Sequence, residues 1–170
     1  MPELAVTAVG ADRPGIIARL TGVLLEHGGN LEDTAMTILS GQFAMVLVVS
    51  AATDAAALQA ALGAATTDLD LVIGVAEVAP GERSRPATHV VSVYGSDHPG
   101  MLHAAATVLA DRGVNVTDLS TRVLSGESPV YAMMLEVTLP EDVDADALTD
   151  ALQATGGVDA SIHALDVATM

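Results

Sequence analysis

Apolar residues recur along the chain with two periods, and these periods alternate in a fixed order. The run "ELAVTAV" at residues 3–9 repeats at every second position, which predicts a strand with Val6 and Ala8 on one face. After Pro14 the spacing becomes helical, and this stripe comprises Ile16, Ile17, Leu20, Val23 and Leu24. Gly28 suits the end of such a helix, because glycine adopts a left-handed conformation at little cost.

The segments that follow complete a unit. Residues 30–41 and 42–51 are predicted to form two strands that meet in a turn at Ser40–Gly41. A second helix is predicted from about Asp54 to Ala65, and an alternating strand over residues 69–78 closes the unit. The predicted order of elements is therefore β-α-β-β-α-β.

The same pattern returns 85 positions later, so the chain contains an internal repeat. The segment "GADRPGIIARL" from Gly10 aligns with "GSDHPGMLHAA" from Gly95. The second helical stripe comprises Met101, Leu102, Ala105, Val108 and Leu109. Its later elements are predicted as a helix over residues 141–155 and a strand over residues 158–167.

Two domains follow from this repeat. The stretch "PGERSRP" within residues 80–87 has the composition of a linker, so we predict one domain over residues 1–79 and a second over 88–170. The order of elements predicts an α+β fold of two ferredoxin-like units in tandem, with antiparallel sheets and both helices on one face. Such sheets leave edges and one face uncovered, so we expect a homodimer.

Charge excludes one class of function. The chain has six basic residues, all of them arginine, against 22 acidic ones, and its net charge is -16. Direct nucleic-acid binding needs clustered cations, and an acidic surface also disfavours anionic membranes. No apolar run reaches the roughly 18 to 20 residues of a spanning helix, and the start "MPELAV" is not typical of a signal peptide. Without cysteine there is no disulfide framework, so we expect a soluble cytoplasmic protein.

The two Asp-x-Pro-Gly segments are the candidate chemistry. Each lies where a strand is predicted to enter a helix, whose first amides are unpaired and can bind a carboxylate. Asp12 and Asp97 are then either N-caps of the helices or acceptors for a ligand ammonium group. Asn30 and Asn115 open the next strand and offer both a donor and an acceptor. A helix N-terminus together with an Asp and an amide fits a free amino acid.

Other polar residues give no further site. The acidic run that contains Asp142, Asp144 and Asp146 lacks the glycine and the glutamate of a calcium loop, and acids are expected at a helix start. No nucleophile elbow or phosphate-binding loop is present in the sequence. We therefore expect no catalytic residues, no metal and no cofactor.

The segments "DRPGI", an amphipathic helix, "EHGGN" and a pair of strands resemble an ACT domain, a small ligand-binding module attached to many enzymes of amino-acid metabolism. In the second copy, "DHPGM" with "DRGVN" is a similar match. The resemblance covers nearly the whole chain and is closest to the stand-alone double-ACT proteins of the glycine cleavage system transcriptional repressor family. It implies a ferredoxin-like fold with the ligand between paired ACT units.

The resemblance also implies ligand contacts. In the first unit they are Asp12, Arg13, Pro14, Gly15, Ile16, Asn30 and Leu31. In the second unit they are Asp97, His98, Pro99, Gly100, Met101, Asn115 and Val116. Serine-binding members often have Asn in place of Asp12 and Asp97, and His in place of Gly10 and Gly95, so the ligand stays unidentified. Because the copies also differ at Gly29 and Val114, we predict unequal affinities.

These observations favour a non-enzymatic regulatory protein that binds a small amino acid and signals to a protein partner, in amino-acid metabolism or its transcription. Any effect on transcription would pass through another protein, because the charge disfavours direct contact with DNA. The alternative hypothesis keeps the fold without the ligand. In that case the chain is a structural interaction or dimerisation module that uses a sheet edge and its acidic surface.

Overall fold

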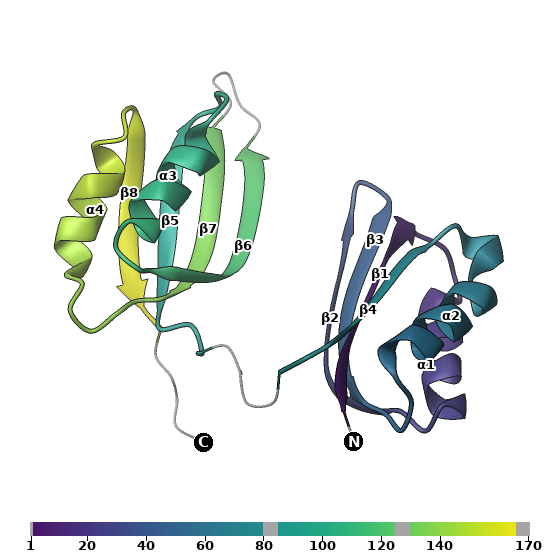
Figure 1. The fold of residues 1–170 in the computed structure, drawn as a ribbon. Coiled ribbons are helices and arrows are strands. Elements are labelled where there is room, and N and C mark those ends of the chain that lie inside the picture. Colours follow the sequence, from purple (N-terminus) through teal and green to yellow (C-terminus); the bar gives the residue numbers. More distant parts are fainter. Residues whose placement is uncertain (1, 80–84, 125–129, 166–170) are drawn as a thin grey trace. The chain divides into compact units, whose positions relative to one another are not determined.

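The computed structural model describes residues 2–79, 85–124 and 130–165. The chain divides into two compact units, Met1–Glu82 and Arg83–Met170 (Figure 1). Residues 80–84 of the predicted linker lie outside the described residues, as do residues 166 and 167 of the last predicted strand.

Both units have the predicted order of elements. Unit 1 contains β1 (Glu3–Ala11), α1 (Ile16–Glu26), β2 (Asn30–Leu39), β3 (Gln42–Ser50), α2 (Ala55–Ala65), the 3-10 turn η1 (Thr67–Leu69) and β4 (Val72–Glu77). Unit 2 contains β5 (His89–Ser96), α3 (Met101–Ala110), β6 (Asn115–Leu124), β7 (Val130–Thr138), α4 (Ala145–Gln153) and β8 (Val158–Ala164).

Each unit forms one antiparallel sheet of four strands. The strand order is β2-β3-β1-β4 in unit 1 and β6-β7-β5-β8 in unit 2. Neighbouring strands are antiparallel throughout, and both helices of a unit lie on one side of its sheet (Figure 1). The predicted α+β class, with two tandem ferredoxin-like units, is confirmed.

The core of unit 1 lies between its sheet and its two helices. Leu4, Val6 and Ala8 alternate along β1 and are fully buried. They belong to one apolar cluster with Leu20 of α1 and Leu58 of α2. Unit 2 has a separate cluster of the same kind, which includes Val91, Val93, Leu109, Leu135, Leu148 and Leu152. The strand and helix periodicities therefore identified most of the buried residues, but Ile17 of the predicted stripe is 44% exposed.

The helix α4 begins later than predicted. We expected it from Glu141, but it begins at Ala145, and Asp144 is its N-cap. The Asp144 carboxylate accepts a hydrogen bond from the Asp146 backbone N–H at 3.1 Å. This cap satisfies one of the free amides of the first turn, so the acidic run has a structural role here.

The strand β4 also begins later than residue 69, because Thr67–Leu69 forms the turn η1. Asp70 follows in the left-handed region with φ 50°, which ends the turn before the strand starts. The predicted hairpin at Ser40–Gly41 is present, with φ of 50° and 77° at its two residues. Such positive values match the right-handed twist of the flanking strands. None of the helices among the described residues is long and apolar enough to cross a membrane.

Two glycines of unit 1 should respond to alanine in opposite directions. A Cβ on Gly10 would lie 2.7 Å from Leu71 Cδ2 and 3.0 Å from the Asp70 carbonyl oxygen. A Cβ on Gly22, inside α1, meets nothing within 4 Å. We expect Gly10→Ala to lower the free energy of unfolding by about 1–3 kcal/mol through overpacking. Gly22→Ala should raise it by about 0.5–1 kcal/mol through helix propensity. Urea denaturation measures both, and equal shifts would contradict the close approach at Gly10.

Candidate functional site

The Pro-Gly pair before each first helix forms a tight turn. Gly15 has φ 92° and ψ -6°, and Gly100 has φ 92° and ψ -4°. These angles match the third residue of a type II turn, whose second position favours proline. Pro14 and Pro99 therefore precede the helices, which begin at Ile16 and Met101.

The glycine of this turn is the N-cap of the helix, and it brings no side-chain hydrogen bond to the first turn. The Asp12 and Asp97 carboxylates accept no hydrogen bond among the described residues, so the capping alternative for them is wrong. Instead, the backbone N–H of Asp12 donates to the Gly41 carbonyl at 2.9 Å. This bond ties the loop after β1 to the turn between β2 and β3.

The helix starts leave amides available. The first intrahelical bond runs from the Arg19 N–H to the Gly15 carbonyl at 3.0 Å, and its counterpart runs from the Ala104 N–H to the Gly100 carbonyl at 2.9 Å. The amides before Arg19 and Ala104 have no acceptor within the helix. Ile16 and Met101 are 2% and 4% exposed, so their side chains anchor the helices in the cores. Only the backbone of these two residues can face a ligand.

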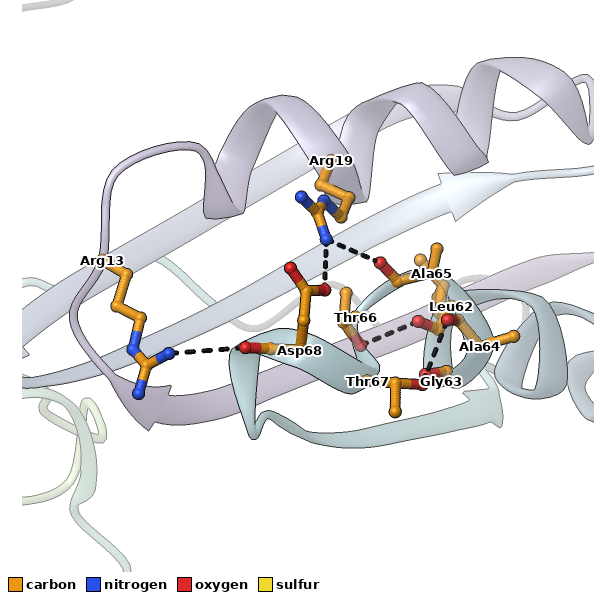
Figure 2. A network of polar contacts seen from close by, with 9 residues as sticks. All are labelled: Arg13, Arg19, Leu62, Gly63, Ala64, Ala65, Thr66, Thr67 and Asp68. Carbon is orange, nitrogen blue, oxygen red and sulfur yellow. Dashed lines mark hydrogen bonds and ion pairs between the residues drawn. The ribbon is translucent and has the colours of Figure 1, made fainter.

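In unit 1 a polar network surrounds the start of α1. Figure 2 shows Arg19 directed to the Ala65 carbonyl and the Asp68 carboxylate, and Arg13 directed to the Asp68 carbonyl. Arg13 also lies 3.9 Å from the Asp70 carboxylate. These side chains are about half exposed or more, so the pairs contribute at most about 1 kcal/mol each. Their main effect is to hold the loop against η1.

The described residues of unit 2 form no equivalent network at the start of α3. Its residues at the positions of Arg13 and Arg19 are His98 and Ala104. The His98 Nδ1 lies 3.1 Å from the Pro99 carbonyl oxygen in the same loop. Gly95 lies against the Gly157 backbone carbonyl, as Gly10 lies against the Asp70 backbone carbonyl in unit 1. Unit 2 therefore has a glycine, and no carboxylate, at the position of Asp70.

A pocket of about 390 Å³ lies at this end of the unit 2 sheet. It is lined by Tyr94, Gly95, Ser96, Val130, Gly157, Val158 and Asp159. Sequence reasoning did not identify Tyr94 or Asp159 as site residues, because neither belongs to the repeated motif. The Gly157 position, which has φ 69°, is the signal that could have pointed to this opening.

Asn30 and Asn115 begin the edge strands β2 and β6, at the opposite end of each sheet from the helix start. Asn30 is opposite Ser50, which in turn is opposite Glu3, whereas Asp12 follows the last residue of β1. Eight residue steps along β1 separate the two ends by about 27 Å. No single unit therefore brings its Asp and its Asn together.

The strand β2 carries its predicted contacts on an exposed edge. The Asn30 Nδ2 donates to Glu32 Oε1 at 3.1 Å, and a bulge lies between Leu31 and Asp33. Leu31 is 44% exposed, and its counterpart Val116 is 36% exposed. Both residues are free to contact a neighbouring unit.

Asn115 lies in a second pocket, of about 240 Å³, together with Arg85, Gly113, Thr138 and Pro140. Arg85 forms no ion pair among the described residues. The sequence assigned Arg85 to the linker by composition, and unit 1 has no residue that corresponds to it. The pocket therefore adds a cation that the repeat could not reveal.

No metal centre is formed by the residues that the structure describes. They contain no group of three or more His, Asp or Glu side chains placed to hold an ion.

Family models of the ACT domain match residues 3–76 and residues 89–156. The chain is 28% identical over 147 residues to the glycine cleavage system transcriptional repressor of Escherichia coli, which covers 85% of this chain and 77% of the repressor. It is 31% identical over 144 residues to a phosphoserine phosphatase of Mycobacterium tuberculosis, covering 81% of this chain but only 34% of the enzyme.

A solved structure of an unknown protein from Galdieria sulphuraria superimposes on the chain with a TM-score of 0.82. It is 26% identical and covers 96% of this chain and 98% of its own. Both halves of the chain thus match the same domain family in sequence, and each half has the corresponding fold. The chain belongs to the ACT-domain family and consists of two ACT domains in tandem.

Proposed function

We propose that this protein is a non-enzymatic regulator that binds a small amino acid and signals to a protein partner. The observation that carries the proposal is the duplicated helix start, in which glycine N-caps leave free amides. The Asp12 and Asp97 carboxylates of the same loops have no ion-pair partner among the described residues. The amides suit the carboxylate of an amino acid, and the aspartates suit its ammonium group.

Each helix start is completed by the edge strand of a second ACT unit. All residues of β2 and β6 are exposed, so both edges are free to pair. The strand β2 runs from Asn30 to Leu39, and Leu39 lies at the same end of the sheet as the start of α1. Antiparallel pairing of two such edges reverses one of them. Asn30 of one unit then lies at the helix-start end of the other.

A regulatory role is supported by the similarity to the Escherichia coli repressor. The net charge of -16 favours a protein as the recipient of the signal, because nucleic acid would repel the chain. We place this regulator in the cytoplasm. The phosphoserine phosphatase shares only the part that this chain covers, so its activity does not bear on the proposal.

The two units differ in what surrounds the helix start. In unit 1 the Arg13 and Arg19 guanidinium groups are engaged by Asp68 and Asp70. In unit 2 the same region opens into the pocket beside Tyr94 and Gly157. These surroundings support unequal affinities for the amino acid, with tighter binding at α3, where the approach is more open.

Calorimetric titration of the whole protein with each of the twenty amino acids tests ligand binding. We expect at least one to bind, and Asn30→Ala and Asn115→Ala each to weaken one of two binding events by about tenfold, since each removes hydrogen bonds to a charged ligand. Gln59→Ala on α2 is the matched control, because Gln59 is an exposed amide on a helix that packs against β4, at the edge of the sheet opposite β2. It should leave binding unchanged.

The opposite result would favour the ligand-free interaction module. No heat with any amino acid, together with capture of a protein partner that no amino acid alters, would overturn the sensor function while leaving the fold intact.

Arg85 provides a second test, because its guanidinium lines the Asn115 pocket without an ion pair among the described residues. If it contacts a ligand carboxylate, Arg85→Ala should weaken binding at one site about tenfold. Arg85→Lys keeps a positive charge in the pocket and serves as the control. Titration curves of both variants that match the native protein would show that Arg85 takes no part in binding.

A further inference from the structure

The sheet face of unit 1 that lies away from the helices has an uncharged central region on β1, β3 and β4. This unit 1 open face consists of nine residues from three neighbouring strands. They are Ala5, Thr7 and Val9 of β1, Ala44, Val46 and Val48 of β3, and Val72, Gly74 and Ala76 of β4. All nine residues are Ala, Val, Gly or Thr. Val9, Val46 and Val72 are 46%, 47% and 74% exposed. A contiguous apolar surface of this kind marks an interaction site.

Unit 2 supplies an internal comparison, because its sheet has the same register. Asp159 pairs with Tyr94 in unit 2, and the corresponding pair in unit 1 is Val72 with Val9. Glu136 pairs with Val90 in unit 2, and the corresponding pair in unit 1 is Val48 with Ala5. The open face of unit 2 thus carries carboxylates where unit 1 carries valines, and it also carries His163 where unit 1 carries Ala76. The fold tolerates charge at these positions, so folding alone does not require the apolar face of unit 1.

We propose that the unit 1 open face binds the same face of a second copy of this chain. Two flat sheets with small apolar side chains can stack at about 10 Å, as in a β-sandwich. A face without charge is complementary to itself across a twofold axis. The unit 2 face fits less well as the occupant, because Glu136 and Asp159 would be buried against valines without partners.

The size of the face agrees with a reversible dimer. Three strands at about 4.8 Å and five residues at about 3.4 Å each define a plane of roughly 14 by 17 Å. Two such planes give about 480 Å², and side-chain relief keeps the buried total below about 1,200 Å², the range of weak, transient interfaces. Glu3 and Asp33, also on this side of the sheet, stand at its margin and would form a polar rim. We expect a weak dimer, with a dissociation constant of about 100 µM, that needs no amino acid.

Sedimentation velocity over a range of protein concentrations, without amino acids, tests this dimer. Val48→Glu and Val72→Asp introduce the residues that unit 2 carries at the same positions, so both variants should fold. Each should raise the dissociation constant by about a hundredfold, because a dimer would bury two unpaired carboxylates. Ser161→Glu adds the same charge to the open face of unit 2 and should leave the dissociation constant unchanged.

Thermal melts followed by circular dichroism confirm that each variant is folded. If Val48→Glu does not fold, Val72→Asp at the exposed edge is enough to test the dimer. Two results overturn the proposal. One is a wild-type protein that stays monomeric up to about 1 mM, well above the dissociation constant expected for an interface of this size. The other is a dimer that Val48→Glu and Val72→Asp leave intact, which would place the contact at a sheet edge or on unit 2. Neither result bears on amino-acid binding, which calorimetry measures separately.

Discussion

Each sheet in this protein has helices on one face only, and most other features follow from that constraint. The buried side chains of β1 alternate with uncovered ones. Packing in the core therefore constrains every second residue of an inner strand and leaves the residues between them unconstrained. The edges β2 and β6 extend beyond the helical layer, and all their residues are exposed. Such a unit has its own core, but one edge and one face of its sheet stay uncovered. Its free edge and free face are where the two copies could acquire different partners.

Much of the fold could be predicted because the same pattern of apolar residues occurs twice in the chain. The strand and helix periods, the turn at Ser40–Gly41 and the residues of both cores were accessible from spacing alone. The starts of elements were less accessible, because several polar residues compete to cap a helix. Asp144 directly precedes α4 and caps it, whereas Asp12 lies four residues before Ile16 and does not act as a cap. The difference lies in the Pro-Gly turn, whose backbone geometry puts a glycine in the capping position.

The candidate site was predictable in its parts but not in its assembly. The sequence identified the helix starts and the asparagines, yet in each unit these stand at opposite ends of the sheet. Bringing them together requires a second unit, which no spacing within one copy can specify. Arg85 was missed for a related reason, because a residue in an apparent linker has no counterpart in the repeat and looks like a connection. Its place in a pocket with Asn115 depends on tertiary structure.

The scarcity of aromatic residues has a consequence for observing this protein. The chain contains no tryptophan and only two tyrosines, Tyr94 and Tyr131, and both belong to unit 2. Tyr94 is 40% exposed and lines the pocket beside Gly157, while Tyr131 packs against the unit 2 core. Tyrosine fluorescence of the native chain therefore arises from one domain alone, and Phe43 of unit 1 does not absorb in the tyrosine band. The tyrosine emission of the unmodified protein thus reports events in the second ACT domain separately from those in the first.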